Sequence, residues 1–304
     1  MTGADREQGN GIGVLFDQVL GFTVPSRHVR GRFVRLGPVL DTILAAHDYP
    51  AAVRHLLAEG LVLSALMGSL LKAPGSQLTL QAQIQDGPVD LLVTDFREGE
   101  LRGYVRHDPA ALALAGANAN LATLFGEGFL AATFETGEAG QRYQGIVPLE
   151  GDSLAAACES YFRNSEQIPT MIRVAVRTGP QGCVAGGMLM QYLPEGEEGR
   201  ERLHVRPDRP NWEHMAILGG SVRHDELVDQ ALPLADLVWR LFHEEQQVLV
   251  APGPVLSRGC RCSADYYAAV LAKFPVNERQ AMRDDQGDIL VDCAFCSRTF
   301  RIDL

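Results

Sequence analysis

The sequence has almost no lysine, since Lys72 and Lys273 are the two lysines among 304 residues. Neither of them follows a glycine, so a Gly-Lys phosphate-binding loop is absent and P-loop ATP chemistry is excluded. Acidic residues also outnumber basic ones, which gives a formal net charge of -11 and a pI near 5.2. Because sequence-independent binding of nucleic acid depends on clustered basic residues, we expect no nucleic-acid partner and no use of ATP.

Long apolar runs are also missing. The longest, Leu61 to Leu71, is interrupted by Ser64, Gly68 and Ser69 and is shorter than the roughly 20 residues that a membrane-spanning helix needs. The N-terminal residues are polar and lack the basic and apolar regions of a signal peptide, so we interpret 1–12 as a disordered arm. These features predict a cytoplasmic protein with no membrane partner.

Cysteine is present but sparse, with six residues in a chain of ordinary globular composition, 46% hydrophobic and 21% charged. A chain of this length is expected to form about two domains. Because cellular thiols keep cytoplasmic cysteines reduced, six cysteines favour metal binding or redox chemistry over a disulfide scaffold.

Residues 13–195 alternate between helical and strand-like patterns. Apolar residues recur at spacings of three and four over 51–72, which predicts a long core helix ending before Pro74-Gly75. Apolar and polar residues alternate over 78–85, which predicts a strand with one polar face. Further strands with tight turns are expected at 89–94, 101–106, 129–134, 141–148, 171–177 and 184–192. We therefore predict an α+β core domain over 13–195, with an antiparallel sheet and helices.

The segment 196–256 differs in character from the core domain. It begins with a stretch dense in Glu, Arg and Pro, which we interpret as the domain boundary. Beyond it, 226–230 and 234–244 have helical apolar spacing but are separated by Pro233. We predict a marginally stable helical linker over 196–256, with an ordinary helical connector as the alternative.

The residues that could bind a metal or undergo redox reactions lie in the C-terminal region. Cys260 and Cys262 form a Cys-x-Cys pair, and Cys293 and Cys296 form a Cys-x-x-Cys pair about thirty residues later. Four thiolates select zinc, so we predict one zinc ion per chain and a small zinc-binding domain over 257–304. Zinc that only stabilises the fold would use the same ligands. A redox switch is favoured because a disulfide across Cys-x-Cys would depart from relaxed geometry and be easily reduced.

Two enzymatic interpretations are less consistent with the sequence. A thiol-disulfide oxidoreductase would use Cys293 and Cys296, but no thioredoxin-like strand and helix surround them. A metalloprotease motif would need a second histidine after His243, and Gln247 stands at that position. We therefore expect no enzyme, and keep a constitutive zinc-stabilised protein-binding module and the oxidoreductase as alternatives to the redox switch.

With these cysteine pairs, the chain resembles the heat-shock protein 33 family of redox-regulated holdase chaperones. The resemblance extends in order through segments that include Asp86-Gly87-Pro88, Arg142-Tyr143-Gln144-Gly145, Leu149-Glu150-Gly151-Asp152, Gly186-Gly187-Met188-Leu189 and Trp239-Arg240-Leu241. It covers all but the first dozen residues. It implies an inactive zinc-bound reduced state, activation by oxidants, disulfides Cys260–Cys262 and Cys293–Cys296, and a homodimer that binds unfolding client proteins without ATP.

The energies involved predict what oxidation does. A cysteine-rich zinc site contributes roughly 10 to 16 kcal/mol of apparent binding energy, which in a small domain is folding energy. Disulfides that close loops as short as these would return only roughly 1.5 to 2 kcal/mol each. We therefore expect oxidation to unfold the C-terminal domain and to loosen the linker. The apolar linker residues that would then become available to clients are Leu237, Val238, Leu241 and Phe242.

Overall fold

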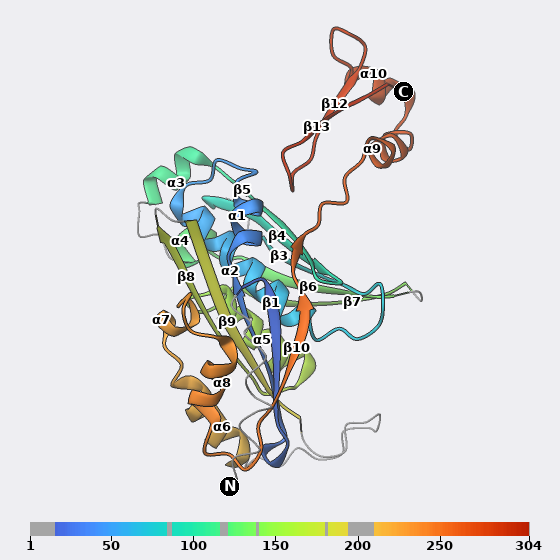
Figure 1. Ribbon diagram of the computed structural model, residues 1–304. Coiled ribbons are helices and arrows are strands. Elements are labelled where there is room, and N and C mark those ends of the chain that lie inside the picture. Colours follow the sequence, from blue (N-terminus) through green and yellow to red (C-terminus); the bar gives the residue numbers. More distant parts are fainter. Residues whose placement is uncertain are drawn as a thin grey trace.

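The computed structural model describes residues 16–83, 87–115, 121–137, 140–179, 182–193 and 210–303. The chain forms two large sheets that enclose a long helix, a set of three helices on one side, and a small C-terminal unit beyond the end of the sheets (Figure 1). This confirms the predicted α+β class with antiparallel sheets. The arm predicted at 1–12 lies outside the described residues.

The first sheet has five strands in the order β10-β1-β2-β9-β8, with every neighbouring pair antiparallel. Its strands are β1 (Gln18–Val24), β2 (Val29–Leu36), β8 (Thr170–Gly179), β9 (Gly182–Tyr192) and β10 (Leu249–Val255). The strands β1, β2 and β10 are additions to the sequence prediction. Since β10 belongs to this sheet, the range 196–256, expected to be a helical linker, also contains a strand.

The second sheet has six strands in the order β11-β5-β4-β3-β6-β7. Its strands are β3 (Gln77–Gln83), β4 (Val89–Arg97), β5 (Glu100–His107), β6 (Phe129–Thr136), β7 (Gln141–Pro148) and β11 (Ser257–Arg258). All pairs are antiparallel except β11 with β5, which are parallel. The short strand β11 joins the C-terminal unit directly to the edge of this sheet.

Helix α2 (Ala51–Gly68) lies between the two sheets and contacts β2, β8 and β9 of one and β3, β4 and β5 of the other. It ends at Gly68 rather than near residue 72, because tight turn hydrogen bonds follow it and the Ser69 hydroxyl donates to the carbonyl of Leu66 at 2.8 Å. By length and composition α2 could cross a membrane, but 78% of it is buried inside the protein. It is therefore the core helix.

Shorter helices complete the core domain. They are η1 (Pro25–Arg27), α1 (Pro38–Leu44), α3 (Pro109–Ala115), α4 (Leu121–Phe125), α5 (Leu154–Tyr161) and the π-helical turn η2 (Phe162–Glu166). Ser153 caps α5 by accepting the N–H of Ala156 at 3.2 Å.

Three helices cover the face of the five-stranded sheet that points away from α2 (Figure 1). They are α6 (Pro210–Gly220), α7 (His224–Leu227) and α8 (Leu234–Phe242). The buried side of α8 packs on β1, where the rings of Phe242 and Phe22 stack with their centroids 5.2 Å apart. These helices therefore have a core of their own, separate from the core around α2.

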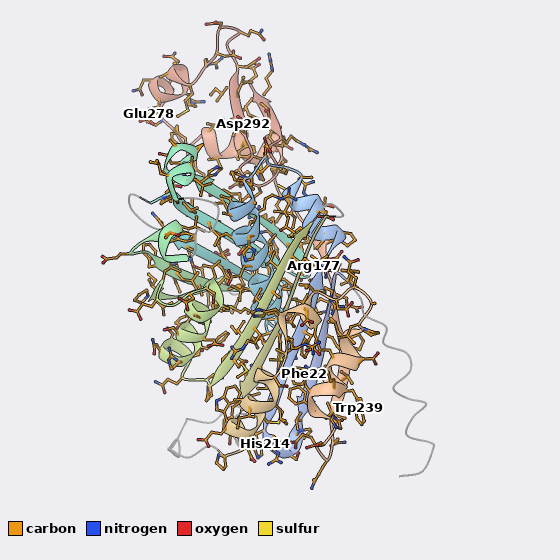
Figure 2. All side chains as sticks on the ribbon, turned by 90° about the vertical axis from the view of Figure 1, so that its left-hand side faces the viewer. Phe22, Arg177, His214, Trp239, Glu278 and Asp292 are labelled. Carbon is orange, nitrogen blue, oxygen red and sulfur yellow. The ribbon has the colours of Figure 1, made fainter. Side chains whose placement is uncertain are left out.

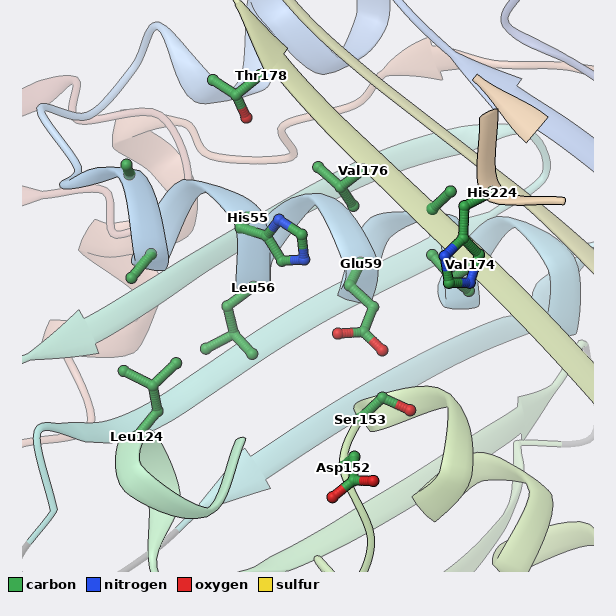
Figure 3. A pocket seen from close by; sticks show the side chains of 13 residues that line it. His55, Leu56, Glu59, Leu124, Asp152, Ser153, Val174, Val176, Thr178 and His224 are labelled. Carbon is green, nitrogen blue, oxygen red and sulfur yellow. The ribbon is translucent and has the colours of Figure 1, made fainter. Parts of the chain in front are cut away.

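A cavity of about 570 Å³ lies between α2, α4, β8 and the start of α5. Figure 3 shows the carboxyl group of Glu59 within it, pointing toward Ser153. Glu59 is 8% exposed and accepts the N–H of Ala155 at 3.0 Å. Burial raises the pKa of Glu59 to about 7, although the N–H groups of Ala155 and Leu154 oppose this shift by stabilising the carboxylate.

The raised pKa of Glu59 predicts a stability that depends on pH. Its folded-state pKa exceeds its unfolded value of 4.5, so the carboxyl stabilises the fold fully below pH 4.5, and this contribution is lost as pH rises through about 7. Glu59→Gln should therefore stabilise the core domain at pH 8 by up to about 3 kcal/mol and change little at pH 4.5. Urea unfolding at both pH values measures this.

The exposed Glu150 provides a matched control for this experiment. Glu150→Gln should unfold at the same urea concentration as the unsubstituted protein at pH 8. An equal gain in both variants, or a gain for Glu59→Gln that is as large at pH 4.5 as at pH 8, would contradict the assignment of the pH dependence to Glu59.

Candidate metal centre

The four C-terminal cysteines come from two local structures. Cys260 and Cys262 lie between β11 and α9 (Ala264–Leu271), which begins directly after its cap, Ser263, where the side chain accepts the N–H of Tyr266. Cys293 and Cys296 lie in the turn between β12 (Ile289–Asp292) and β13 (Thr299–Ile302), which form an antiparallel pair. The second cysteine pair therefore lies in a turn between two paired strands.

The turn that carries Cys293 and Cys296 has the hydrogen bonding of a metal-binding knuckle. The Cys293 N–H donates to the carbonyl of Arg298 at 2.9 Å, which closes the hairpin. The Cys293 carbonyl accepts the N–H of Ser297 at 2.8 Å, and Ser297 takes a left-handed conformation with φ of 54°. The backbone therefore bends tightly enough to turn both sulfur atoms to the same side.

The four sulfur atoms converge on one point. All lie within 4.8 Å of one another, with Sγ–Sγ distances of 3.2 Å for Cys260 and Cys262, 3.4 Å for Cys262 and Cys296, and 3.6 Å for Cys260 and Cys293. A tetrahedral ion with metal–sulfur bonds of about 2.3 Å would separate its ligands by about 3.8 Å. No disulfide joins any of the four. Their donor set and spacing fit a tetrahedral metal ion.

The surroundings shift the pKa values of Cys293 and Cys262 in opposite directions. Burial would raise the pKa of Cys293, but hydrogen bonds from the Tyr267 hydroxyl and from the N–H groups of Phe295 and Cys296 lower it to about 6. Burial, followed by the neighbouring thiols, raises the pKa of Cys262. N–H groups directed at a sulfur favour its thiolate form, which is the form that binds a metal. The backbone of the turn that carries Cys293 and Cys296 therefore favours the thiolate form that binds a metal.

The unit around these cysteines has a very small apolar core. Its buried apolar residues are Leu271, Ile289 and Ile302, with Tyr267 and Phe300 partly buried beside them. The short helix α10 (Val276–Ala281) adds no buried residue. Full burial of three aliphatic side chains contributes about 5 to 9 kcal/mol, far less than the entropy cost of ordering a unit of this length. A metal ion held by the four cysteines would consequently be the dominant stabilising contribution.

The knuckle also contacts the core domain. The Phe295 ring meets the Tyr104 ring edge to face, with centroids 4.9 Å apart, and the Arg102 guanidinium lies 4.0 Å above the Phe295 ring. Arg261, between the first two cysteines, pairs with Asp95 at 3.3 Å, and this carboxylate also pairs with Arg102 at 2.6 Å. These contacts join both cysteine pairs to β4 and β5 of the six-stranded sheet.

The two remaining cysteines and the linker residues predicted to bind clients lie away from the metal centre. Cys158 and Cys183 are fully buried in the core around α2, away from the metal centre. The linker residues proposed for client binding are all buried in the core of the three helices: Leu237, Val238, Leu241 and Phe242. They form one apolar side of α8, while Trp239 on the opposite side is 60% exposed (Figure 2).

Sequence reasoning missed the residues that connect the site to its surroundings. Tyr267 lies on α9, outside both cysteine pairs, and its hydroxyl donates to Cys293. Phe295 stands in the sequence only as a spacer between two ligands. Its partners on β5 are about 190 residues away in the sequence, so no local pattern could indicate the contact.

Comparison with known proteins agrees with these features. The family profile described as "Hsp33 protein" matches residues 17–303. A protein named "33 kDa chaperonin" from Caulobacter vibrioides (strain NA1000 / CB15N) is 41% identical over 300 residues, covering 96% of each chain. The protein of the same name from Salmonella typhi is 37% identical over 287 residues, covering 93% of this chain and 91% of its own.

Among solved structures, the 33 kDa chaperonin of Thermotoga maritima has the same fold. It superposes with a TM-score of 0.76 over 94% of this chain and 95% of its own, at 21% sequence identity. The family match over nearly the whole chain and the identity to several chaperonins lead to one conclusion. This chain belongs to the Hsp33 family, which consists of chaperones rather than enzymes.

Proposed function

We propose that the chain is a redox-regulated, ATP-independent holdase that is inactive when reduced and zinc-bound. The observation that carries this proposal is the convergence of four thiols in a unit with three buried apolar residues. Cys260, Cys262, Cys293 and Cys296 hold one zinc ion in the reduced state. The ion supplies the binding energy that the apolar core lacks, so the fold of this unit depends on the redox state of its ligands.

The proposed switch is the oxidation of the four ligands to two disulfides. Each disulfide forms when two thiolates lose two electrons, and hydrogen peroxide accepts these electrons with two protons to give two water molecules. The closest sulfur pair is Cys260 and Cys262, at 3.2 Å, but Cys262 and Cys296 are nearly as close, at 3.4 Å. The pairing Cys260–Cys262 and Cys293–Cys296 therefore rests on the family resemblance and on the short chain between partners.

Loss of the ligands would remove the main stabilising contribution to residues 257–304, the proposed switch domain. Its contacts with Asp95, Arg102 and Tyr104 would be lost with it. We divide the remaining chain into an arm (1–12), the core domain (13–195) and a linker (196–256). Within the linker, α6, α7 and α8 are the part that we expect to loosen, because β10 is hydrogen-bonded into the five-stranded sheet.

Loosening of α8 would expose an apolar surface to unfolding client proteins. This surface consists of Leu237, Val238, Leu241 and Phe242. Exposed apolar surface of this kind binds the apolar segments that unfolding proteins present. We further propose a homodimer in the active state, and a cytoplasmic location, where thiols are kept reduced and available as ligands.

A single experiment tests the proposal. The zinc-loaded protein is oxidised with peroxide at elevated temperature, while zinc release is followed with a chromophoric chelator and client aggregation is followed by light scattering. We expect about one zinc ion released per chain together with suppression of aggregation, and disulfide mapping should show the two proposed pairs. No zinc release, or release without suppression of aggregation, would overturn the proposed function.

The aggregation assay repeated before oxidation and a separate assay of dithiol turnover distinguish the alternatives. A constitutive binding module would suppress aggregation equally well before oxidation. A thiol-disulfide oxidoreductase would turn over dithiol substrates at substoichiometric protein concentration, whereas a holdase requires about one chaperone unit per client.

A further inference from the structure

The cavity of about 570 Å³ beside Glu59 belongs to the core domain, and none of the four clustered cysteines lines it. Small-molecule sites in proteins have volumes of roughly 300 to 1,000 Å³, so this cavity is large enough for one. Its lining residues come from α2, α4, α7, β8 and the loop before α5. A molecule bound in the cavity would therefore contact both the core domain and the linker helix α7.

The cavity exists because the side chains at the start of α2 are small. Ala51 and Ala52 line it there, about one helical turn before His55, and they leave space between α2 and β8 unfilled. On β8, Val174 and Val176 are two residues apart, so both point to the same side of the strand. The walls of the cavity are therefore largely apolar, as is usual for sites that bind small organic molecules.

The charged groups in the cavity are acidic. Figure 3 shows the carboxyl group of Glu59 between Leu124 on one side and His224 on the other. His55 lies four residues before Glu59, so both side chains lie on one face of α2. Asp152 adds a second carboxyl group, and the described residues that line the cavity include no lysine or arginine. Carboxylates without basic partners attract a cation and repel an anion.

The local structure does not require the negative charge of Glu59. Its carboxyl accepts the N–H of Ala155 at 3.0 Å, at the start of α5, where Ser153 already accepts the N–H of Ala156. A glutamine side chain could accept the same N–H through its carbonyl oxygen, without burying a charge. Glu59 is 8% exposed, and its charge destabilises the fold at neutral pH. Such a carboxylate in a cavity is typical of a functional site.

The arrangement of these groups favours an organic cation over a bare metal ion. Within the part of the chain that the structure describes, the four cysteines are the one cluster of three or more His, Cys, Asp or Glu residues close enough to share an ion. The carboxyl groups and histidines of the cavity therefore do not converge as metal ligands do. The apolar walls would instead bury a hydrocarbon body whose ammonium group reaches Glu59.

We propose that this cavity binds a small organic amine, whose ammonium group donates hydrogen bonds to the Glu59 carboxylate and whose apolar body lies against Leu124, Val174 and Val176. The inference goes beyond the proposed function, since amine binding requires neither the metal ion nor oxidation of the cysteines. His224 is the first residue of α7, so the bound amine also contacts the linker.

Calorimetric titration of the full-length, zinc-loaded and reduced protein tests this proposal. The titration is done at pH 8, because burial raises the pKa of Glu59 to about 7 and the carboxyl is then mostly ionised. The probes are an amine, an alcohol and a carboxylate that each carry the same phenylbutyl group. We expect the amine to bind about tenfold more tightly than the alcohol, since its hydrogen bond to Glu59 is charge-assisted, and the carboxylate not to bind.

Three variants assign the binding to the cavity. Glu59→Gln should lower the affinity for the amine about tenfold and leave the affinity for the alcohol unchanged. Ala52→Phe should abolish binding of both probes, because the larger ring fills the space between α2 and β8. Glu244→Gln is the matched control, since Glu244 is an exposed carboxyl outside the cavity, and it should change neither affinity.

Several results would overturn the inference. They are absence of amine binding, equal affinities for the amine and the alcohol, and an amine affinity that Glu59→Gln leaves unchanged. Amine binding that survives Ala52→Phe would place the probe at another site and would also overturn it. If Ala52→Phe does not fold, Val176→Phe fills the cavity from β8 instead. All of these measurements use the reduced protein, so none of them bears on the proposed switch.

Discussion

Replacing Cys293 by serine should abolish metal binding and leave residues 257–303 without a stable fold, while both large sheets stay intact. The physical reason is the size of the C-terminal core, whose buried apolar residues are Leu271, Ile289 and Ile302. Their burial contributes about 5 to 9 kcal/mol, whereas a zinc site contributes roughly 10 to 16 kcal/mol. The sheets have separate cores, so they should not unfold with this unit.

Hydrogen exchange measured by mass spectrometry checks this prediction. Peptides from β12 and β13 should exchange at the rate of an unfolded chain, and peptides from α2 should remain protected. Zinc content should fall from one ion per chain to none. Cys183→Ala is the matched control, because Cys183 is a buried thiol of the core around α2 and should leave both zinc content and exchange of β12 unchanged. Protected β12 amides in metal-free Cys293→Ser would contradict the prediction.

The same variant separates loss of metal from gain of disulfides. In Cys293→Ser the bridge to Cys296 cannot form, yet the switch domain should already be unfolded under reducing conditions. If loss of the ligand set is the activating event, the reduced variant should hold clients at elevated temperature. Activity that appears only after peroxide treatment would instead assign a direct role to the remaining disulfide.

The sequence predicted those parts of the fold that depend on local patterns. The clear alternation over 78–85 corresponds, as far as residue 83, to β3, which has one buried and one more accessible face, while 84 and 85 lie outside the described residues. The cluster of four cysteines was identifiable because two residues or fewer separate the members of each pair. Local spacing is sufficient for such features, since the backbone between the residues is too short to adopt many arrangements.

Other parts could not be predicted from local patterns. Strand β2 is buried at six of its eight positions, so its apolar residues do not alternate cleanly. Strand β10 contains Pro252 and Pro254, and proline normally indicates a turn rather than a strand. These two prolines are tolerated because β10 is an edge strand of its sheet. Contacts such as that of Phe295 with Tyr104 join distant parts of the chain and leave no periodic signal.

Arg35 is the most consequential residue that the sequence did not reveal. An arginine in a strand normally points into solvent, but Arg35 of β2 is fully buried. Its guanidinium donates to the carbonyls of Leu227 at 2.8 Å, Leu232 at 2.7 Å and Glu226 at 3.0 Å. Arg177 of β8 adds a bond to the carbonyl of Val228 at 2.8 Å. Two arginines of the five-stranded sheet therefore hold the backbone at and after the end of α7.

Replacing Arg35 by methionine should release the three linker helices without touching the metal centre. Burial lowers the pKa of Arg35 to about 10, so the side chain is still cationic at neutral pH and makes charge-assisted hydrogen bonds. Such bonds contribute about 1.5 to 3 kcal/mol each, offset in part by the cost of burying the charge. We expect a net loss of about 3 kcal/mol in linker docking, and hydrogen exchange in α6 to α8 that is about 10²-fold faster.

Two further variants make this prediction specific. Gly186→Ala should have a similar effect for a steric reason, because a methyl group at Gly186 of β9 would collide with the carbonyl oxygen of Leu227. Arg32→Met is the matched control, since Arg32 lies on the same strand and donates to the carbonyl of its neighbour Gly31. Unchanged exchange of α8 in both Arg35→Met and Gly186→Ala would show that the linker is held by its apolar core alone.

The contacts of Arg35 with the linker are separate from the metal centre, so this variant tests the effect of linker release alone. In Arg35→Met the four cysteines keep their surroundings, so zinc content and the protection of β12 should equal those of the unsubstituted protein. If exposure of the linker is the step that allows client binding, this variant should suppress client aggregation while still reduced and zinc-loaded. A released linker without client binding would place the holding activity on another surface of the protein.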